Sequence, residues 1–277
     1  IRLGKAEKIT SIADFLAARY DKDLFAGAML KDIPDASLPG NPRFVFYATS
    51  LQTGRSLRFR QDFVADYLLG INPAAQVPLS VAVAASSAFP PVFSPIVLDT
   101  DPDAWREGSK APELASLRSR VVLTDGAVYD NMGLESLVDR VDLVLVSDAG
   151  APFGIDEEPW GDNVLQLGRV RDILIDQTRA LRKRWLVSEF EAGRKRGAYW
   201  GIGTRIGDYK AADPLAADST ITGELDEVPT RLAAFDERLQ GRLMNWGYAL
   251  CDAALRTRAK LALSPSPGLP APGYGLA

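Results

Sequence analysis

Near the N-terminus, apolar and polar positions follow two different periods. Between residues 10 and 20 the apolar side chains recur at three- and four-residue steps, which predicts a helix, and residues 23–30 predict a second, shorter one. Residues 43–49 are rich in aromatic and β-branched side chains, and residues 56–60 alternate between polar and apolar. With Thr53-Gly54 as the turn between them, these two segments predict a β-hairpin.

The middle of the chain has the pattern of a small-residue helix and two apolar strands. Pro78 precedes a run of alanine, valine and serine at 81–88, which predicts a helix that neighbouring backbone can approach closely. Residues 120–124 and 141–146 are short and largely apolar, as in strands covered on both faces, and residues 133–138 fit a short helix. This order predicts a parallel strand pair joined by a crossover.

The remainder is predicted to be mostly helical. Two long amphipathic helices are indicated by apolar positions at three- and four-residue steps: Leu167, Val170, Leu174, Thr178, Leu181 and Trp185 in the first, and Leu232, Phe235, Leu239, Leu243, Trp246 and Leu250 in the second. We expect an edge strand at 198–202. Residues 1–262 would form one α/β domain, followed by a flexible proline- and glycine-rich tail at 263–277.

The composition excludes several classes of function. Hydrophobic residues make up 47% of the 277 positions and charged residues 25%, which is ordinary for a globular protein. The net charge of −4 does not favour nucleic-acid binding. The chain has no histidine, which rules out a Ser–His–Asp triad and disfavours zinc and iron sites. Cys251 is the single cysteine and is expected to pack as a small apolar residue, so no disulfide is predicted.

The sequence shows no segment long enough to cross a membrane. The longest apolar stretch, 77–89, is shorter than a membrane span requires and contains serines. We therefore expect a cytoplasmic protein or one at the membrane periphery. Because the sequence begins with Ile1 rather than Met, we also expect that an N-terminal segment has been removed and that the chain is less stable than a complete domain.

Two aspartates follow the two apolar strands. Asp125, followed by Gly126, ends the first strand, and Asp148 ends the second. Ligands of open α/β sheets bind beyond the carboxyl ends of the strands, where a carboxylate can act as a general base. An ordinary Asp-Gly turn also explains Asp125, and the spacing alone does not separate the two candidates.

Three other features have simpler explanations. Ser86 and Ser87 end the small-residue helix, and the G-x-S-x-G signature of an activated serine occurs nowhere in the sequence, so both are predicted to be packing and capping residues. The glycine-rich segment 201–207 departs from dinucleotide-loop spacing, which argues against nucleotide binding. Basic residues cluster at the end of the first long helix and just after it, where the helix dipole favours cations, and a lipid-headgroup patch is the alternative: Arg179, Arg182, Lys183, Arg184 and 194–196.

Two segments resemble motifs of the bacterial patatin-like phospholipases. Residues 84–93 (AASSAFPPVF) are similar to that family's small-residue helix and Phe-Pro-Pro turn. Residues 123–134 (LTDGAVYDNMGL) are similar to its Asp-Gly-Gly/Ala motif with a downstream Asn and Gly-Leu. The two motifs in this order are more specific than either alone, and the similarity extends over about residues 1–258.

The resemblance implies a three-layer α/β/α sandwich that here lacks its N-terminal strands. It also implies lipid acyl-ester hydrolysis, of phospholipase A or lysophospholipase type, by a Ser–Asp dyad acting on a lipid or phospholipid without a metal or organic cofactor. Asp125 is the position that matches the dyad's base, whereas Asp148 matches no motif of the family.

The sequence departs from the family upstream of these segments. The glycine-rich oxyanion turn and the G-x-S-x-G elbow are both missing, so this chain would supply only the aspartate and is expected to be inactive as an esterase by itself. The alternative is a non-catalytic patatin-fold domain that binds lipid or another protein. A third hypothesis is a hydrolase that uses Asp125 or Asp148 as its own nucleophile. The absence of a D-x-D pattern around both residues argues against this hypothesis.

Overall fold

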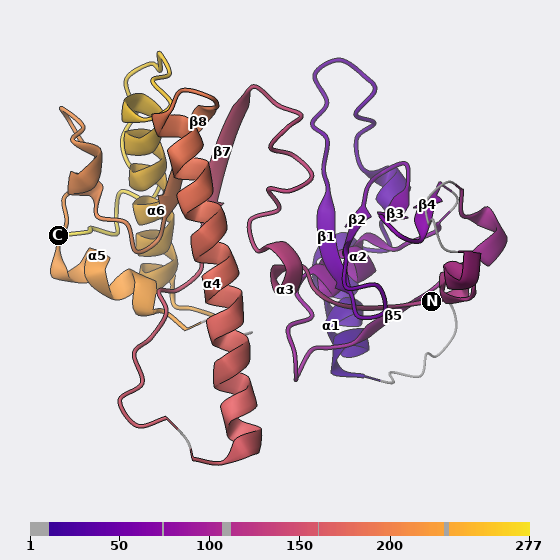
Figure 1. Ribbon diagram of the computed structural model, residues 1–277. Helices are drawn as coiled ribbons and strands as arrows, with labels where there is room; N and C mark the ends of the chain where they lie inside the picture. The colour runs from indigo at the N-terminus through magenta and orange to yellow at the C-terminus, as the bar shows by residue number, and fades with distance from the viewer. Residues whose placement is uncertain (1–10, 74, 107–111, 160, 230–232) are drawn as a thin grey trace. The chain divides into compact units, whose positions relative to one another are not determined.

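The chain forms two compact units, Ile1–Gly133 and Leu134–Ala277, each with its own sheet and its own apolar core. The computed structural model describes residues 11–73, 75–106, 112–159, 161–229 and 233–277 (Figure 1). The α/β class expected from the sequence is confirmed, and the single domain predicted over 1–262 is divided into these two units. Of the positions used in the predictions, Thr10 and Leu232 lie outside the described residues.

A curled antiparallel sheet of six strands, in the order β4-β3-β2-β1-β6-β5, builds the first unit (Figure 1). The strands are β1 (Phe46–Ser50), β2 (Ser56–Phe59), β3 (Val64–Asp66), β4 (Gly70–Asn72), β5 (Ile96–Asp99) and β6 (Arg120–Asp125). The predicted hairpin is confirmed as β1 and β2, with Thr49 opposite Ser56. Strands β3 and β4 were not predicted, because three residues are too few for alternation to be recognised.

Helix α2 (Leu79–Ser86) is the buried helix of the first unit and confirms the small-residue prediction. It contacts α1 (Ile12–Tyr20) as well as strands β1 and β6. Its alanines at 82, 84 and 85 are completely buried, so their small side chains allow these three elements to approach closely.

The helix predicted at 23–30 is wrong. Helix α1 continues into a single π turn, η1 (Asp21–Phe25), which ends because Ala26 and Gly27 both have left-handed backbone conformations, with φ of 48° and 83°. Three short 3-10 segments complete the unit: η2 (Leu30–Asp32), η3 (Pro102–Ala104) and η4 (Pro112–Ser119).

The parallel pair predicted between 120–124 and 141–146 is also wrong. Strand β6 pairs antiparallel with β1 on one side and with β5 on the other, so neither of its edges is free. Residues 133–138, predicted to be helical, form turns after the short helix α3 (Ala127–Asp130).

A parallel strand pair with a helical crossover is present, but it is formed by the next two strands along the chain. Strand β7 (Leu143–Asp148) pairs with β8 (Arg196–Gly201), and the long helix α4 (Asn163–Glu191) connects them within the second unit (Figure 1). Both α4 and α6 (Glu237–Thr257) contact β8. The predicted second amphipathic helix is therefore confirmed, but it begins only at Glu237, where Asp236 caps it by accepting a hydrogen bond from the Leu239 N–H.

The C-terminal segment, predicted to be a flexible tail, packs on α6 instead. The buried side chain of Asn245 donates hydrogen bonds to the carbonyls of Ala271 and Tyr274 and accepts one from the Ala271 N–H. The Tyr274 ring lies directly against Gly241, where no side chain keeps it away. Three shorter elements connect β8 to α6: η5 (Ile206–Tyr209), α5 (Thr220–Glu224) and η6 (Leu225–Glu227).

None of the helices in the described ranges is long and apolar enough to span a membrane.

Candidate active site at Asp125

Asp125 is held in place by backbone contacts on both sides of its strand. It is the last residue of β6 and lies opposite Ala48 of β1. Its N–H donates a hydrogen bond to the Ala88 carbonyl (3.0 Å), and its own carbonyl accepts one from Thr49 Oγ1 (2.8 Å). The position of the carboxylate is therefore determined by a central strand of the sheet.

The two segments that resemble the patatin-like motifs meet at this point. Besides the bond from Asp125 to Ala88, the Gly126 N–H donates to the Ser86 carbonyl (3.3 Å) and Thr124 Oγ1 donates to the Ala88 carbonyl (3.0 Å). The end of α2 is thus fastened to the end of β6 by three hydrogen bonds. These residues are distant in the sequence, and the sequence gives no direct indication that they are in contact.

Tyr47 of β1 is a residue of this site that sequence analysis did not identify. A Cβ atom on Gly126 would lie 2.5 Å from the Tyr47 carbonyl oxygen, so only glycine fits at that position. Gly133 has a positive φ of 62°, and a Cβ there would lie 3.2 Å from the Tyr47 ring. An aromatic residue in a predicted hairpin has no feature that would assign it to a site, so only the packing could reveal Tyr47.

The carboxylate of Asp125 is half-buried and has few partners. Its Oδ1 accepts a hydrogen bond from the Ala127 N–H (2.7 Å), as in the ordinary Asp-Gly turn that the sequence also allowed. Among the described residues, no lysine or arginine forms an ion pair with it. Burial therefore raises the pKa of the Asp125 carboxyl, and the hydrogen bond from Ala127 opposes this effect only in part.

Asp148, the other candidate, lies in the second unit and has a full set of partners. Its Oδ1 accepts from the Gly150 N–H (2.9 Å), its Oδ2 accepts from the Tyr199 hydroxyl (2.7 Å), and Arg179 Nε lies 3.9 Å from Oδ2. Burial, together with the hydrogen bond to Asp148, raises the pKa of Tyr199, so its hydroxyl remains a donor. Such a carboxylate serves as a buried structural acceptor.

The hydroxyl of Ser87 and the thiol of Cys251 are both held in unreactive states. Ser87 is the C-cap of α2, and its Oγ donates to the Val83 carbonyl (2.9 Å), as a helix-capping residue does. Cys251 is half-buried on α6, and burial raises the pKa of its thiol. Neither side chain is activated as a nucleophile by these surroundings.

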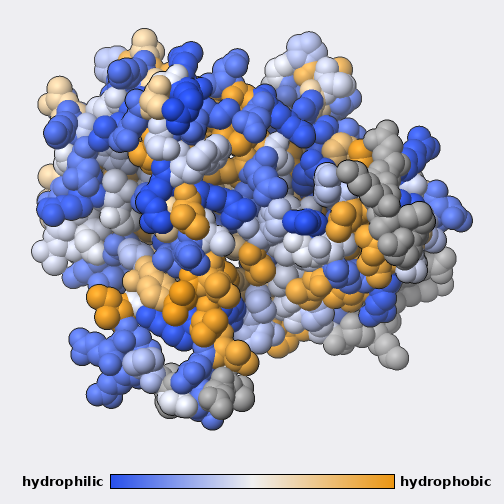
Figure 2. Space-filling model, in the orientation of Figure 1, coloured by the Kyte–Doolittle hydropathy of each residue, from blue (hydrophilic) through white to orange (hydrophobic). Residues whose placement is uncertain are grey.

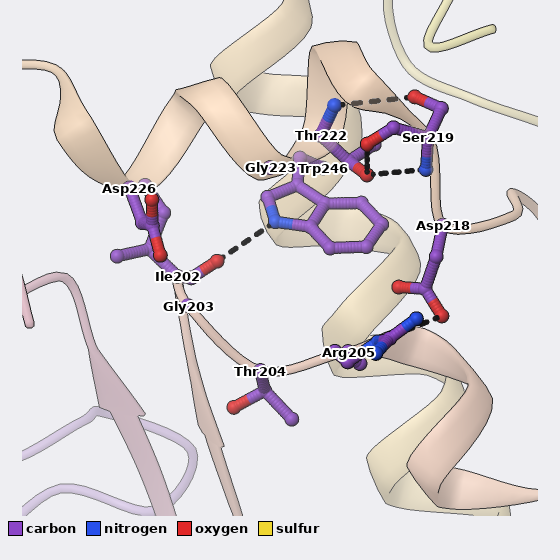
Figure 3. A pocket seen from close by; sticks show the side chains of 10 residues that line it. All are labelled: Ile202, Gly203, Thr204, Arg205, Asp218, Ser219, Thr222, Gly223, Asp226 and Trp246. Carbon is purple, nitrogen blue, oxygen red and sulfur yellow. Dashed lines mark hydrogen bonds and ion pairs between the residues drawn. The ribbon is translucent and has the colours of Figure 1, made fainter.

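The second unit also contains a pocket of about 360 Å³, in the size range of small-molecule sites (Figure 3). Its lining residues are Ile202, Gly203, Thr204, Arg205, Asp218, Ser219, Thr222, Gly223, Asp226 and Trp246. The Trp246 ring is part of the pocket lining and donates its indole N–H to the Ile202 carbonyl (2.9 Å). The Asp218 carboxylate accepts hydrogen bonds from the N–H groups of Ile206 and Gly207. The glycine-rich segment discarded as a nucleotide loop therefore forms one wall of this pocket.

Within the described parts of the chain, no three side chains of the metal-binding types come together. The sequence was also compared with models of known protein families and with curated proteins, and neither comparison found a match.

Proposed function

We propose that Asp125 is the general base of a Ser–Asp lipid acyl hydrolase of phospholipase A or lysophospholipase type, in a patatin-like three-layer α/β/α domain. The observation that carries the proposal is the contact of residues 84–93 with residues 123–134 at Asp125, through the hydrogen bonds from Asp125 to Ala88 and from Gly126 to Ser86. The two segments on which the resemblance depends are distant in the sequence. If Asp125 is the base of the dyad, these segments have to meet at Asp125.

In the proposed reaction Asp125 first takes the proton of a serine hydroxyl while the serine oxygen attacks the ester carbonyl. The C–O bond to the alcohol then breaks, and the alcohol leaves with that proton. Water hydrolyses the acyl-enzyme, with Asp125 accepting the water's proton and returning it to the serine. A raised carboxyl pKa and one oxygen without a partner among the described residues suit Asp125 to this role.

The proposed nucleophile lies outside the printed sequence, which contains no G-x-S-x-G elbow. We therefore expect this chain by itself to leave short-chain aryl esters intact and to remain unlabelled by a fluorophosphonate, which reacts with activated serines. Rapid labelling of a serine within this chain would contradict the proposal, because the dyad would then have a different composition.

The decisive test uses the coding sequence upstream of Ile1 and the protein it specifies. We expect an open frame with a glycine-rich turn followed by G-x-S-x-G. In that protein Asp125→Asn should lower kcat for a short-chain aryl ester by roughly 10²–10⁴-fold. Asp99→Asn is the matched control, since Asp99 is an exposed aspartate at the end of the neighbouring strand β5. Equal activity of the two variants would refute the role of Asp125.

The second candidate is a non-catalytic domain of the same fold that binds lipid. It is favoured by the missing serine elbow in the printed sequence. A start codon directly upstream of Ile1, together with vesicle binding in the absence of ester hydrolysis, would support this function and exclude the first.

A further inference from the structure

The predicted apolar stripe of α4 faces outward. Leu167 is 66% exposed, Leu174 56% and Leu181 51%, and Val170 and Trp185 on the same face are also exposed. Steps of three and four residues keep these side chains in one row, which extends for about 27 Å along the helix axis. Figure 2 shows hydrophobic side chains gathered at the surface over the lower half of α4.

The opposite face of α4 holds the helix to its own unit. Leu186 is completely buried there, and Lys183 lies 4.4 Å from the Tyr199 ring centroid of β8. Arg179, on the same side, reaches both Asp148 and the Ala151 carbonyl. The arrangement is the reverse of an ordinary surface helix, because charged side chains face the unit and the apolar row faces out.

Between Leu167 and Trp185, the charged side chains of α4 beside the exposed row are all basic, and Glu189, one turn beyond Trp185, is paired with Arg194. Arg171 and Arg182 lie along one flank and Arg184 along the other, whereas the acidic residues Asp172 and Asp176 are on the opposite side of the helix. Arg184 is exposed and has no acidic partner among the described residues. Arg171 and Arg182 form half-exposed ion pairs with Asp172 and Glu135, and pairs of this kind are weak enough to exchange partners.

This distribution of charge disfavours a second copy of the chain as the partner. In an antiparallel pairing of two such rows, Leu167 of one copy would lie opposite Trp185 of the other, and Arg171 would then lie opposite Arg182. A parallel pairing would bring Arg184 of one copy near Glu189 of the other, but Glu189 is already paired with Arg194 of its own chain. The surface that complements the row is therefore apolar in its interior and negative at its boundary.

We propose that α4 docks on a lipid surface with anionic headgroups, with the row from Leu167 to Trp185 inserted among the acyl chains and the three flanking arginines at the phosphates. An exposed helix with a row of leucines, a tryptophan at its end and arginines alongside has the chemistry of an interfacial helix. The inference does not depend on the proposed hydrolysis, because binding is measured without turnover.

Co-sedimentation of the chain with vesicles tests the proposal. We expect binding to phosphatidylcholine vesicles that contain phosphatidylserine and weaker binding to phosphatidylcholine alone. The double variant Leu174→Asp/Leu181→Asp should bind at least about tenfold more weakly. Leu51→Asp is the matched control, since Leu51 is also 56% exposed but lies in the first unit. Arg184→Glu should weaken binding to the anionic vesicles about fivefold or more, whereas Arg43→Glu, at an exposed position of the first unit, should not.

Three results would overturn the proposal: no vesicle binding, equal binding by the double variant and by Leu51→Asp, or equal binding to both types of vesicle. A concentration-dependent dimer in sedimentation velocity that the double variant disrupts, without vesicle binding, would assign the row to self-association instead. Asp125→Asn should bind vesicles normally, so a failed hydrolase assay and a failed docking assay remain distinguishable.

Discussion

Asp125 and Asp148 follow the same sequence pattern and have opposite surroundings. Each ends a short apolar strand and is followed within two residues by a glycine. The Asp148 carboxylate receives hydrogen bonds from Gly150 and Tyr199, with Arg179 nearby, whereas the Asp125 carboxylate receives one, from its own turn. The difference arises from what other parts of the chain supply, because α4 and β8 bring side chains to Asp148 and no described cation pairs with Asp125.

This contrast separates a structural carboxylate from one whose surroundings suit chemistry. Partners that stabilise a buried charge also fix its orientation. Desolvation of a carboxylate that has no cation nearby lowers the stability of the fold and raises the pKa of the carboxyl, as it does at Asp125. Carboxyl groups with a raised pKa are common in catalytic sites.

The largest expected difference is in stability when each side chain is removed. Asp148→Ala should lower the free energy of unfolding by about 3 kcal/mol, because it leaves the Arg179 cation and the Tyr199 hydroxyl without their buried acceptor. Asp125→Ala should lower it by less than about 1 kcal/mol. Urea denaturation of the two variants measures this, and equal losses would remove the distinction between the two sites.

The glycines after the two aspartates should differ in the same experiment. Gly126→Ala should cost about 2 kcal/mol, because the new Cβ would meet the Tyr47 backbone carbonyl, which cannot move without disturbing β1. At Gly150 the nearest atom is the guanidinium of Arg179, at the end of a flexible side chain, so Gly150→Ala should cost less than about 1 kcal/mol. A larger loss for Gly150→Ala would contradict this account of the close approach.

A smaller effect is expected from Tyr199→Phe, which removes one of the hydrogen bonds to Asp148 and leaves the ring in place. The loss should be about 1 kcal/mol, since the carboxylate keeps its bond from Gly150 and its position near Arg179. Tyr209→Phe is a suitable comparison, because the Tyr209 hydroxyl donates to a backbone carbonyl rather than to a carboxylate. If the two losses were equal, the charge of Asp148 would contribute nothing to its bond with Tyr199.

The smallest effect is a pH dependence of stability that Asp125 should produce. Its folded-state pKa is raised, so from its ordinary value of 3.8 upward the folded state binds more protons than the unfolded state. The contribution of Asp125 to stability is therefore most favourable at low pH and is lost as the pH rises through the folded pKa. Asp125→Asn should flatten this decline in denaturation experiments across that range, and an unchanged slope would show that the carboxylate is not desolvated.

The local elements could be predicted from the sequence because their causes are local. The β1–β2 hairpin, the small-residue helix α2 and the long helix α4 each depend on periodicity and turn residues that lie within the element. The turn at Asp125 belongs to the same class, since an aspartate followed by glycine accepts a hydrogen bond from its own backbone two residues later.

Contacts between distant segments were decided only by the tertiary structure. The apolar strand β6 was expected to pair with β7, but apolar composition identifies a covered strand and does not specify its neighbours. In the same way, proline and glycine content predicted a free tail, whereas Asn245 of α6 supplies hydrogen bonds that fix residues 271 and 274.

The sequence by itself determined the β1–β2 hairpin, the small-residue helix α2 and the two long helices, that no histidine is present, and that Asp125 stands at the end of a strand. The tertiary structure decided that Asp125 meets the end of α2, that Asp148 is satisfied by Tyr199, and that the apolar row of α4 faces outward. The physical reason is the range of the interactions. Periodicity and turn propensity act over a few residues, whereas the partners of a carboxylate and the buried face of a helix depend on which distant segments pack beside them.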